Sequence, residues 1–280
     1  MKLNFDPVTQ DPPEVDLKYP ASVRTFTLDS HGSKLIGSIL IAAGEGPHPT
    51  VILLTGFPGN DTNMDIAHAI RRNGFNVVHF HYRGSWGSGG SYSWSNCIED
   101  SKLVIAYFRS DEVKDLYRCD YKKVILVGHS MGGFITLLNL ANDSLLKHGA
   151  AFAGFNFGLW ADFIKSNEDI KNISLDRMHD SVLLLNGTSE QDLLNEMLQH
   201  NKEWNLINHV KTLAKKDLLL IAAKFDQLAP VELHHFPLSE ALKKYNPTYT
   251  ERIISCGHSF SDKRIELTRE VINWLNKIEF

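Results

Sequence analysis

The feature that most constrains this chain is the run Thr50–Leu54, which is apolar on both faces of the strand it would form. A strand of this kind must be buried on both sides, as the central strands of parallel sheets are. Strand-like and helix-like patterns alternate after it. This alternation predicts right-handed crossovers and a mostly parallel sheet covered by helices on both faces, the α/β class. The strands expected are Val23–Leu28, Lys34–Ile41, Thr50–Leu54, Phe75–Phe80, Val124–Val127, Ala150–Phe155, Asp217–Ala223 and Tyr249–Ser255, and the helices expected are Asp65–Asn73, Ile98–Phe108, one opening at Ser130 and a closing helix with Ile265, Thr268, Ile272 and Leu275 at helical spacing.

With 280 residues, the chain can bury one large core and still carry an insertion. We expect one domain over residues 1–280, with an extended arm at 1–22 and a helical cap inserted at 160–212. The segment 160–212 is helical in pattern, with a capping box at Thr188 and Gln191. Its one ambiguous strand pattern is Val182–Leu185.

The composition excludes several classes of protein. Apolar residues make up 43% and charged residues 22%, which is ordinary globular usage. A net charge of −4 gives no general attraction to nucleic acid. No stretch approaches the roughly 18 apolar residues of a membrane span. The partner expected is a small acyl substrate, and homo-oligomerisation is left open.

The three cysteines, Cys97, Cys119 and Cys256, form no Cys-x-x-Cys and cannot all pair with one another. Free thiols fit a reducing compartment, so we expect a cytoplasmic protein. Residues 1–22 carry four acids and four prolines and do not read as a signal peptide. Removal of an earlier leader is compatible with the same sequence.

The strongest local signal is Gly128–Gly132, with the sequence Gly-His-Ser-Met-Gly, between an apolar strand and a helix-compatible run. This is the context of a nucleophile elbow, in which a strained turn exposes a serine at a helix N-terminus. Small flanking residues permit the turn, and the helix dipole favours negative charge there. The pattern predicts Ser130 as a nucleophile.

A serine hydroxyl needs a neighbouring base. Of the 13 histidines, His258 stands where the base is expected, between the last strand and the closing helix. Asp226 follows the preceding strand and is expected to accept the hydrogen bond that fixes the imidazole. Asp162, after the strand before that one, is the alternative acid, and Asp262 is expected to support the final helix.

Charge on the substrate carbonyl needs two backbone donors. We expect them to be the N–H groups of Met131 and Phe57, with Gly56 allowing close approach and Pro58 stiffening the turn. Phe157, Trp160 and Phe163 are expected in the acyl pocket, although core packing is an equal alternative.

Together these residues resemble the α/β-hydrolase superfamily, in its dienelactone-hydrolase-like and prolyl-oligopeptidase-like branch. The resemblance implies an eight-stranded, mostly parallel sheet and a serine hydrolase that needs no metal or organic cofactor. One departure is Thr55, where family members often have a histidine that braces the oxyanion loop. The matching stretches are Thr55–Gly59, Tyr82–Ser85 with the glycines that follow, Gly128–Gly133, Lys224–Asp226 and Gly257–Asp262.

Other histidines and glycines receive simpler interpretations. His129 is expected to be structural, and His234-His235 a solvated or capping pair. His79 and His81 alternate on a strand but have no evident third metal ligand. The glycines of Gly84–Gly90 lack phosphate-loop spacing and predict a shaped active-site loop.

The function predicted is a serine hydrolase of the carboxylesterase type acting through an acyl-enzyme. A small peptidase or amidase, a thioesterase or an acyltransferase would use the same three residues. A catalytically silent ligand receptor is the alternative from another class. Dehalogenase chemistry is disfavoured because it needs a carboxylate in place of Ser130.

Overall fold

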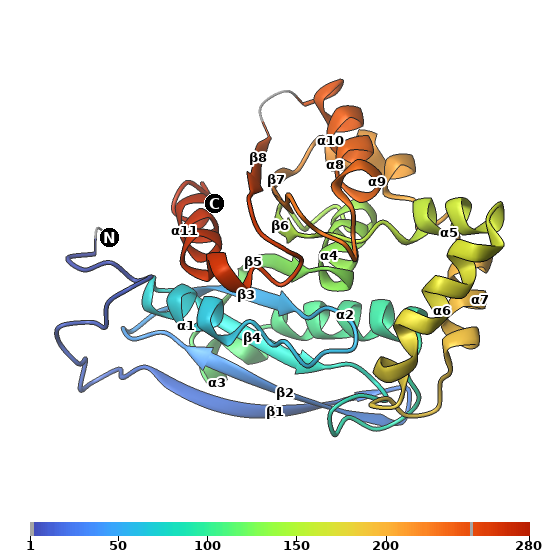
Figure 1. Cartoon of the computed structure of the whole chain (residues 1–280). Helices are drawn as coiled ribbons and strands as arrows, with labels where there is room; N and C mark the ends of the chain where they lie inside the picture. Colours follow the sequence, from blue (N-terminus) through green and yellow to red (C-terminus); the bar gives the residue numbers. More distant parts are fainter. Residues whose placement is uncertain (1–2, 247–248) are drawn as a thin grey trace.

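The computed structural model describes residues 3–246 and 249–280. Its centre is an eight-stranded sheet in the order β1-β2-β4-β3-β5-β6-β7-β8 (Figure 1). The strands β3 to β8 pair in parallel, and β2 is antiparallel to both β1 and β4. The mostly parallel α/β sheet predicted from the sequence is therefore confirmed. The strands are β1 (Ser22–Ser30), β2 (Ser33–Ile41), β3 (His48–Leu54), β4 (Asn76–His81), β5 (Cys119–His129), β6 (His148–Phe152), β7 (Asp217–Ala223) and β8 (Thr250–Ile254).

Helices cover both faces of this sheet and fill the connections between its strands (Figure 1). The helices are α1 (Met64–Arg72), α2 (Trp94–Phe108), α3 (Glu112–Tyr117), α4 (Met131–Asn142), α5 (Phe157–Lys165), α6 (Glu168–Val182), α7 (Glu190–Gln199), η1 (Leu206–His209), α8 (Val210–Leu213), α9 (Val231–His234), α10 (Phe236–Lys243), η2 (Ser261–Lys263) and α11 (Arg264–Leu275).

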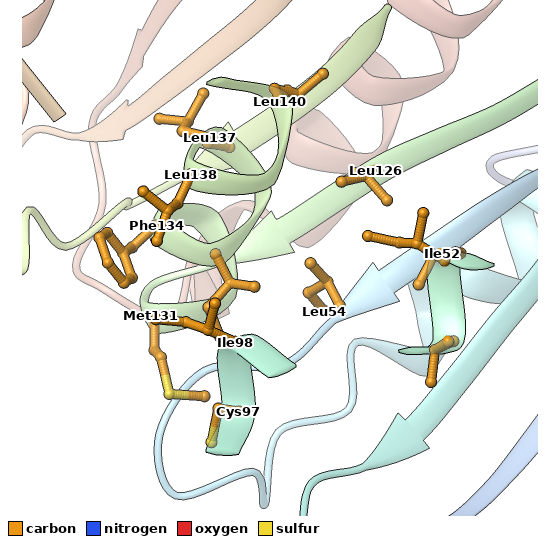
Figure 2. Packing of buried hydrophobic residues seen from close by; sticks show 14 of the residues in the cluster. Ile52, Leu54, Cys97, Ile98, Leu126, Met131, Phe134, Leu137, Leu138 and Leu140 are labelled. Carbon is orange, nitrogen blue, oxygen red and sulfur yellow. The ribbon is translucent and has the colours of Figure 1, made fainter. Parts of the chain in front are cut away.

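Strand β3 explains why the sheet needs cover on both faces. Its side chains alternate, so Val51 and Leu53 pack in the core under α1 and α11, while Ile52 and Leu54 pack in the core under α2 and α4. All four are fully buried. Figure 2 shows the second core, where side chains of β3 and β5 meet those of α2 and α4.

Residues 153–216, all of them described, contain helices and turns but no strand. We call them the helical segment. Its helices α5, α6 and α7 pack on one another to one side of the sheet (Figure 1). Val182–Leu185 forms the end of α6 and a turn, and only Leu185 makes a bridge, to Ser85.

Two local predictions were wrong. Helix α7 is capped by Ser189 rather than Thr188, because the Ser189 side chain accepts a hydrogen bond from the N–H of Asp192. In α11, Thr268, Ile272 and Leu275 are buried but Ile265 is exposed. In the first turn of α11, Leu267 rather than Ile265 faces the core.

The N-terminal arm lies against α1 and α11. Arg72 of α1 donates to the carbonyl oxygen of Pro7 at 2.8 Å, and Arg269 of α11 pairs with Asp6 at 2.7 Å. Val8 packs against the core under the same helices. The Arg269 guanidinium, by its hydrogen bond, holds the pKa of Asp6 well below its usual range.

Candidate active site

The turn between β5 and α4, which we call the elbow (Gly128–Gly132), holds Ser130 in a strained conformation. Its φ is 54° and its ψ is −116°, a region that non-glycine residues rarely adopt. A Cβ on Gly128 would stand 2.1 Å from the carbonyl oxygen of Gly132, and a Cβ on Gly132 would stand 2.1 Å from that of Leu54. Only glycine fits at these two positions, so the sequence motif has a steric cause.

Backbone hydrogen bonds from neighbouring elements hold the elbow in place. The N–H of Ser130 donates to the carbonyl oxygen of Phe152 at 3.0 Å, and its own carbonyl accepts from Phe134 and Phe155. Strain at one residue persists only when its surroundings determine it, and here three elements do so. The side chain of Ser130 is left facing a cavity.

This cavity has a volume of about 330 Å³ and lies between the elbow and the helical segment. Its walls are largely aromatic and thioether side chains, with polar groups contributed by the elbow, by the loop after β3 and by α6. The lining residues are Gly56, Phe57, Asn60, Asp61, Trp94, His129, Ser130, Met131, Phe155, Phe157, Trp160, Ser174, Arg177, Met178, Ser181, Met197, Leu228, His258 and Ser259.

His258 and Asp226 are joined by a hydrogen bond of 2.7 Å from Nδ1 to Oδ2. The Asp226 side chain is 1% exposed, and its second oxygen accepts from the N–H groups of Leu228 and Ala229. These bonds fix the carboxylate in the loop after β7. Asp162, the alternative acid, is exposed and hydrogen-bonded to Asn201, so it is not the residue that the structure places beside the imidazole.

The loop that carries His258 is held by two further side chains. His129 donates from Nε2 to the carbonyl oxygen of His258 at 3.0 Å and stacks on Phe152. Arg264 donates to the carbonyl oxygen of Ser259 and makes a two-pronged ion pair with Asp65 of α1. Burial lowers the pKa of His129 to about 4, so this ring is neutral and supports the loop, as the sequence analysis expected of a structural residue.

Met131 and Phe57, whose N–H groups are the expected oxyanion donors, both line the cavity. Met131 is the first residue of α4, where the N–H has no acceptor within the helix. Gly56 lies so close to the elbow that a Cβ there would stand 3.2 Å from the Cβ of Ser130. The two residues therefore lie near Ser130, Met131 next to it in the elbow and Phe57 on the loop after β3.

The loop after β3 has a brace that the sequence analysis missed. The indole N–H of Trp86 donates to the carbonyl oxygen of Pro58 at 2.9 Å, and the Phe57 ring packs edge-on against Trp94. Trp86 belongs to the glycine-rich loop after β4 and has a φ of 48°. It supports the loop after β3 in this chain, and no local sequence pattern pointed to it.

Comparison with models of protein families identifies the family of this chain. The model of the alpha/beta hydrolase family matches residues 51–266, which include Ser130, Asp226 and His258. The chain belongs to the alpha/beta hydrolase family. No curated protein matches the sequence.

Solved structures of similar fold include both peptidases and esterases. Pyrococcus horikoshii acylaminoacyl peptidase superposes with a TM-score of 0.68 at 18% identity, over 94% of this chain and 43% of its own. A putative dipeptidyl aminopeptidase IV from Bacteroides ovatus superposes with a TM-score of 0.67 at 17% identity, over 92% of this chain and 36% of its own. Pyrococcus furiosus esterase Pf2001 superposes with a TM-score of 0.64 at 20% identity, over 93% of each chain. The chain thus spans less than half of either peptidase, and at these identities the likeness shows the fold.

The remaining candidate residues lie partly in the cavity and partly outside it. Phe157 and Trp160 line the cavity, but Phe163 is exposed and lies outside it. His79 and His81 pack edge-to-face, and no group of three or more potential metal ligands occurs within residues 3–246 and 249–280. No helix in that described part is long and apolar enough to cross a bilayer.

The prediction of a solvated or capping pair at His234-His235 was wrong. His234 is buried against Phe155, accepts from the N–H of Asn156, and has its pKa lowered to about 3 by burial. His235 donates to Glu251 at 2.9 Å. Both are drawn inward because α9 and α10 pack over the edge of the sheet, which the local sequence does not indicate.

Proposed function

We propose that this protein is a serine hydrolase that cleaves carboxylic esters through an acyl-enzyme. The observation that carries the proposal is the 2.7 Å hydrogen bond from His258 to the buried Asp226, beside a cavity that Ser130 and His258 share. A carboxylate on Nδ1 leaves Nε2 free to accept a proton. Ser130 stands at the N-terminus of α4, where the helix dipole favours negative charge.

In the proposed mechanism, Ser130 Oγ attacks the ester carbonyl while His258 Nε2 takes its proton. The N–H groups of Phe57 and Met131 stabilise the oxyanion, and Asp226 stabilises the imidazolium. The imidazolium then protonates the leaving alcohol as the acyl–oxygen bond breaks. Water, activated by the same imidazole, releases the acid and restores Ser130.

The helical segment is proposed to act as a cap over this site. Residues of α5, α6 and α7 complete the cavity opposite the elbow. We propose one domain for the whole chain, with the arm at 1–22 and the cap at 160–212 as its additions. The three cysteines are buried and unpaired, which is compatible with a cytoplasmic location.

An amidase or small peptidase is the second candidate, because acylaminoacyl peptidases share the fold. A thioesterase, an acyltransferase or a silent receptor would keep the same cavity. Turnover on a series of p-nitrophenyl esters of increasing chain length, measured beside aminoacyl-anilides and acyl-thioesters, separates these functions. Faster turnover of anilides than esters would favour the peptidase, and binding without turnover the receptor.

The variant Ser130→Ala tests the ester proposal directly. We expect its ester turnover to fall by about 10³-fold or more, as in other enzymes that lose this nucleophile. Ser259→Ala is the matched control, because Ser259 also lines the cavity but bonds to Ser261. Full activity in Ser130→Ala would refute the proposal.

A further inference from the structure

Helix α6 turns an unusual face toward the cavity. The residues it contributes are Ser174, Arg177, Met178 and Ser181, at positions i, i+3, i+4 and i+7 of one helix face. On a helix that packs against a core, this stripe is apolar. Here three of its four side chains are polar or charged, so the face is suited to a ligand rather than to a protein core.

Arg177 is the one lysine or arginine among the residues lining the cavity. It donates to the carbonyl oxygen of Gln227 at 3.2 Å. In the described part of the chain it forms no ion pair, not even with Asp180 one turn further along α6. Most of its donors and its whole charge are therefore available to a ligand.

The other charged residue of the lining, Asp61, forms no ion pair with Arg177 in the described part of the chain. Asp61 comes from the loop after β3, and its Oδ1 accepts from the N–H of Asn63 at 3.1 Å. The guanidinium of Arg177 thus lines the cavity without a paired carboxylate among the described residues.

The wall formed by α2 and by the start of the helical segment has the opposite character. The residues that line this wall are Trp94, Phe155, Phe157 and Trp160. The ring centroid of Phe157 lies 4.9 Å from that of Trp94 and 5.1 Å from that of Phe155. Aromatic surfaces of this kind hold an apolar group. The substrate must match both an apolar wall and a cationic one.

We propose that Arg177 forms a carboxylate-binding subsite, and that the substrates are esters with one apolar part and one part that bears a carboxylate. This deepens the proposed function and depends on it. A guanidinium binds a carboxylate through two parallel hydrogen bonds. The Ser181 hydroxyl, one turn along the same face, supplies a further donor, whereas the Ser174 hydroxyl already donates to the carbonyl oxygen of Ile170.

Matched ester pairs test the subsite. Mono-p-nitrophenyl glutarate against p-nitrophenyl valerate places the carboxylate on the acyl side. 4-Acetoxybenzoate against phenyl acetate places it on the alcohol side. In at least one pair, the wild-type protein is expected to prefer the anionic ester in kcat/KM. Arg177→Gln should lower the ratio of kcat/KM for the anionic ester to kcat/KM for the neutral ester about tenfold or more, mainly by raising the KM of the anionic ester. The kcat/KM of the neutral esters should stay within about twofold of the wild-type value.

Glutamine is chosen because its amide can still donate toward Gln227 while the charge is removed. Lys171→Gln is the matched control, since Lys171 is a cation of the same helix that pairs with Glu168 and does not line the cavity. An unchanged ratio in both pairs for Arg177→Gln, or an equal fall for Lys171→Gln, overturns the subsite. Failure of the wild-type protein to hydrolyse any of the four esters would instead refute the proposed function.

Discussion

The elbow and helix α6 face each other across one cavity, but they are held in different ways. Ten of the twelve residues of α4, which continues the elbow, are buried, against two of the fifteen in α6. The elbow is fixed by backbone contacts that leave no room for a Cβ at Gly128 or Gly132. In α6 only Ser174 and Val182 are buried, and the other residues are exposed or partly buried.

This difference separates two tasks. Groups that must meet within tenths of an ångström are best placed on well-packed elements. Groups that select a ligand tolerate, and often use, loosely packed ones. We therefore assign the proposed chemistry to the sheet side and substrate choice to α6, and each of the following changes tests one side against the other.

The largest effect is expected at Asp226. Asp226→Asn should lower kcat by about 10⁴-fold, because an amide cannot hold the Nδ1–H tautomer that leaves Nε2 as the base. Asp162→Asn in the helical segment is the control and should keep full activity. Ester hydrolysis by both purified variants measures this. Equal losses in the two variants would contradict the assignment of the acid to the sheet side.

The next effect is on stability. Gly132→Ala should cost about 3 kcal/mol or more, since the added Cβ would overlap the carbonyl of Leu54 and the backbone cannot give way. Asn172→Ala, on the exposed face of α6, should stay within about 0.5 kcal/mol. Urea unfolding of the two variants gives both values. Similar midpoints for the two would remove the contrast between elbow and α6.

A smaller effect sharpens the comparison within the helical segment. Glu196 of α7 accepts from the N–H groups of Trp94 and Ser95 at the N-terminus of α2, and the Trp94 indole donates to the carbonyl of Leu193. Glu196→Gln should therefore cost about 1 kcal/mol, as loss of charge at a capped helix N-terminus does. Glu203→Gln, at an exposed position of the same segment, should be neutral in thermal unfolding. A larger loss of stability in Glu203→Gln than in Glu196→Gln would contradict the anchoring of α7 to α2.

The last effect is seen only in acid and concerns the stability of the sheet side. Burial lowers the pKa of His79 to about 4, below the 6.5 of an ordinary histidine. Between these values the unfolded chain binds a proton that the folded chain does not, so stability falls as the pH falls from about 6.5 to about 4. His79→Phe should flatten that decline and change nothing above pH 7. An unaltered slope in urea unfolding across this range would contradict the buried neutral ring.

Where side chains and backbone interact locally, the sequence predicted well. Strand β3 and the glycines of the elbow have strict local requirements, and β7 was predicted residue for residue. The order of Asp226 and His258 after successive strands brought the two side chains together because parallel strands end at one edge of the sheet. These features can be predicted from the sequence without knowledge of tertiary contacts.

Other features depend on contacts between distant segments and could not be predicted. Trp86 braces Pro58 across 28 positions of sequence, and His234 packs against Phe155 and Trp160 from another part of the chain. The role of α6 was equally hidden. Its apolar pattern indicated a helix, but only the structure shows that the face with Arg177 meets the cavity.

The most direct test of the account is covalent labelling of the intact protein by a fluorophosphonate, followed by mass spectrometry of its peptides. We predict a single adduct on Ser130, formed rapidly by the wild-type protein, slowly by His258→Ala, and absent in Ser130→Ala. An adduct on another residue, or labelling at the wild-type rate after loss of His258, would contradict the proposal that this serine and this imidazole work as one unit.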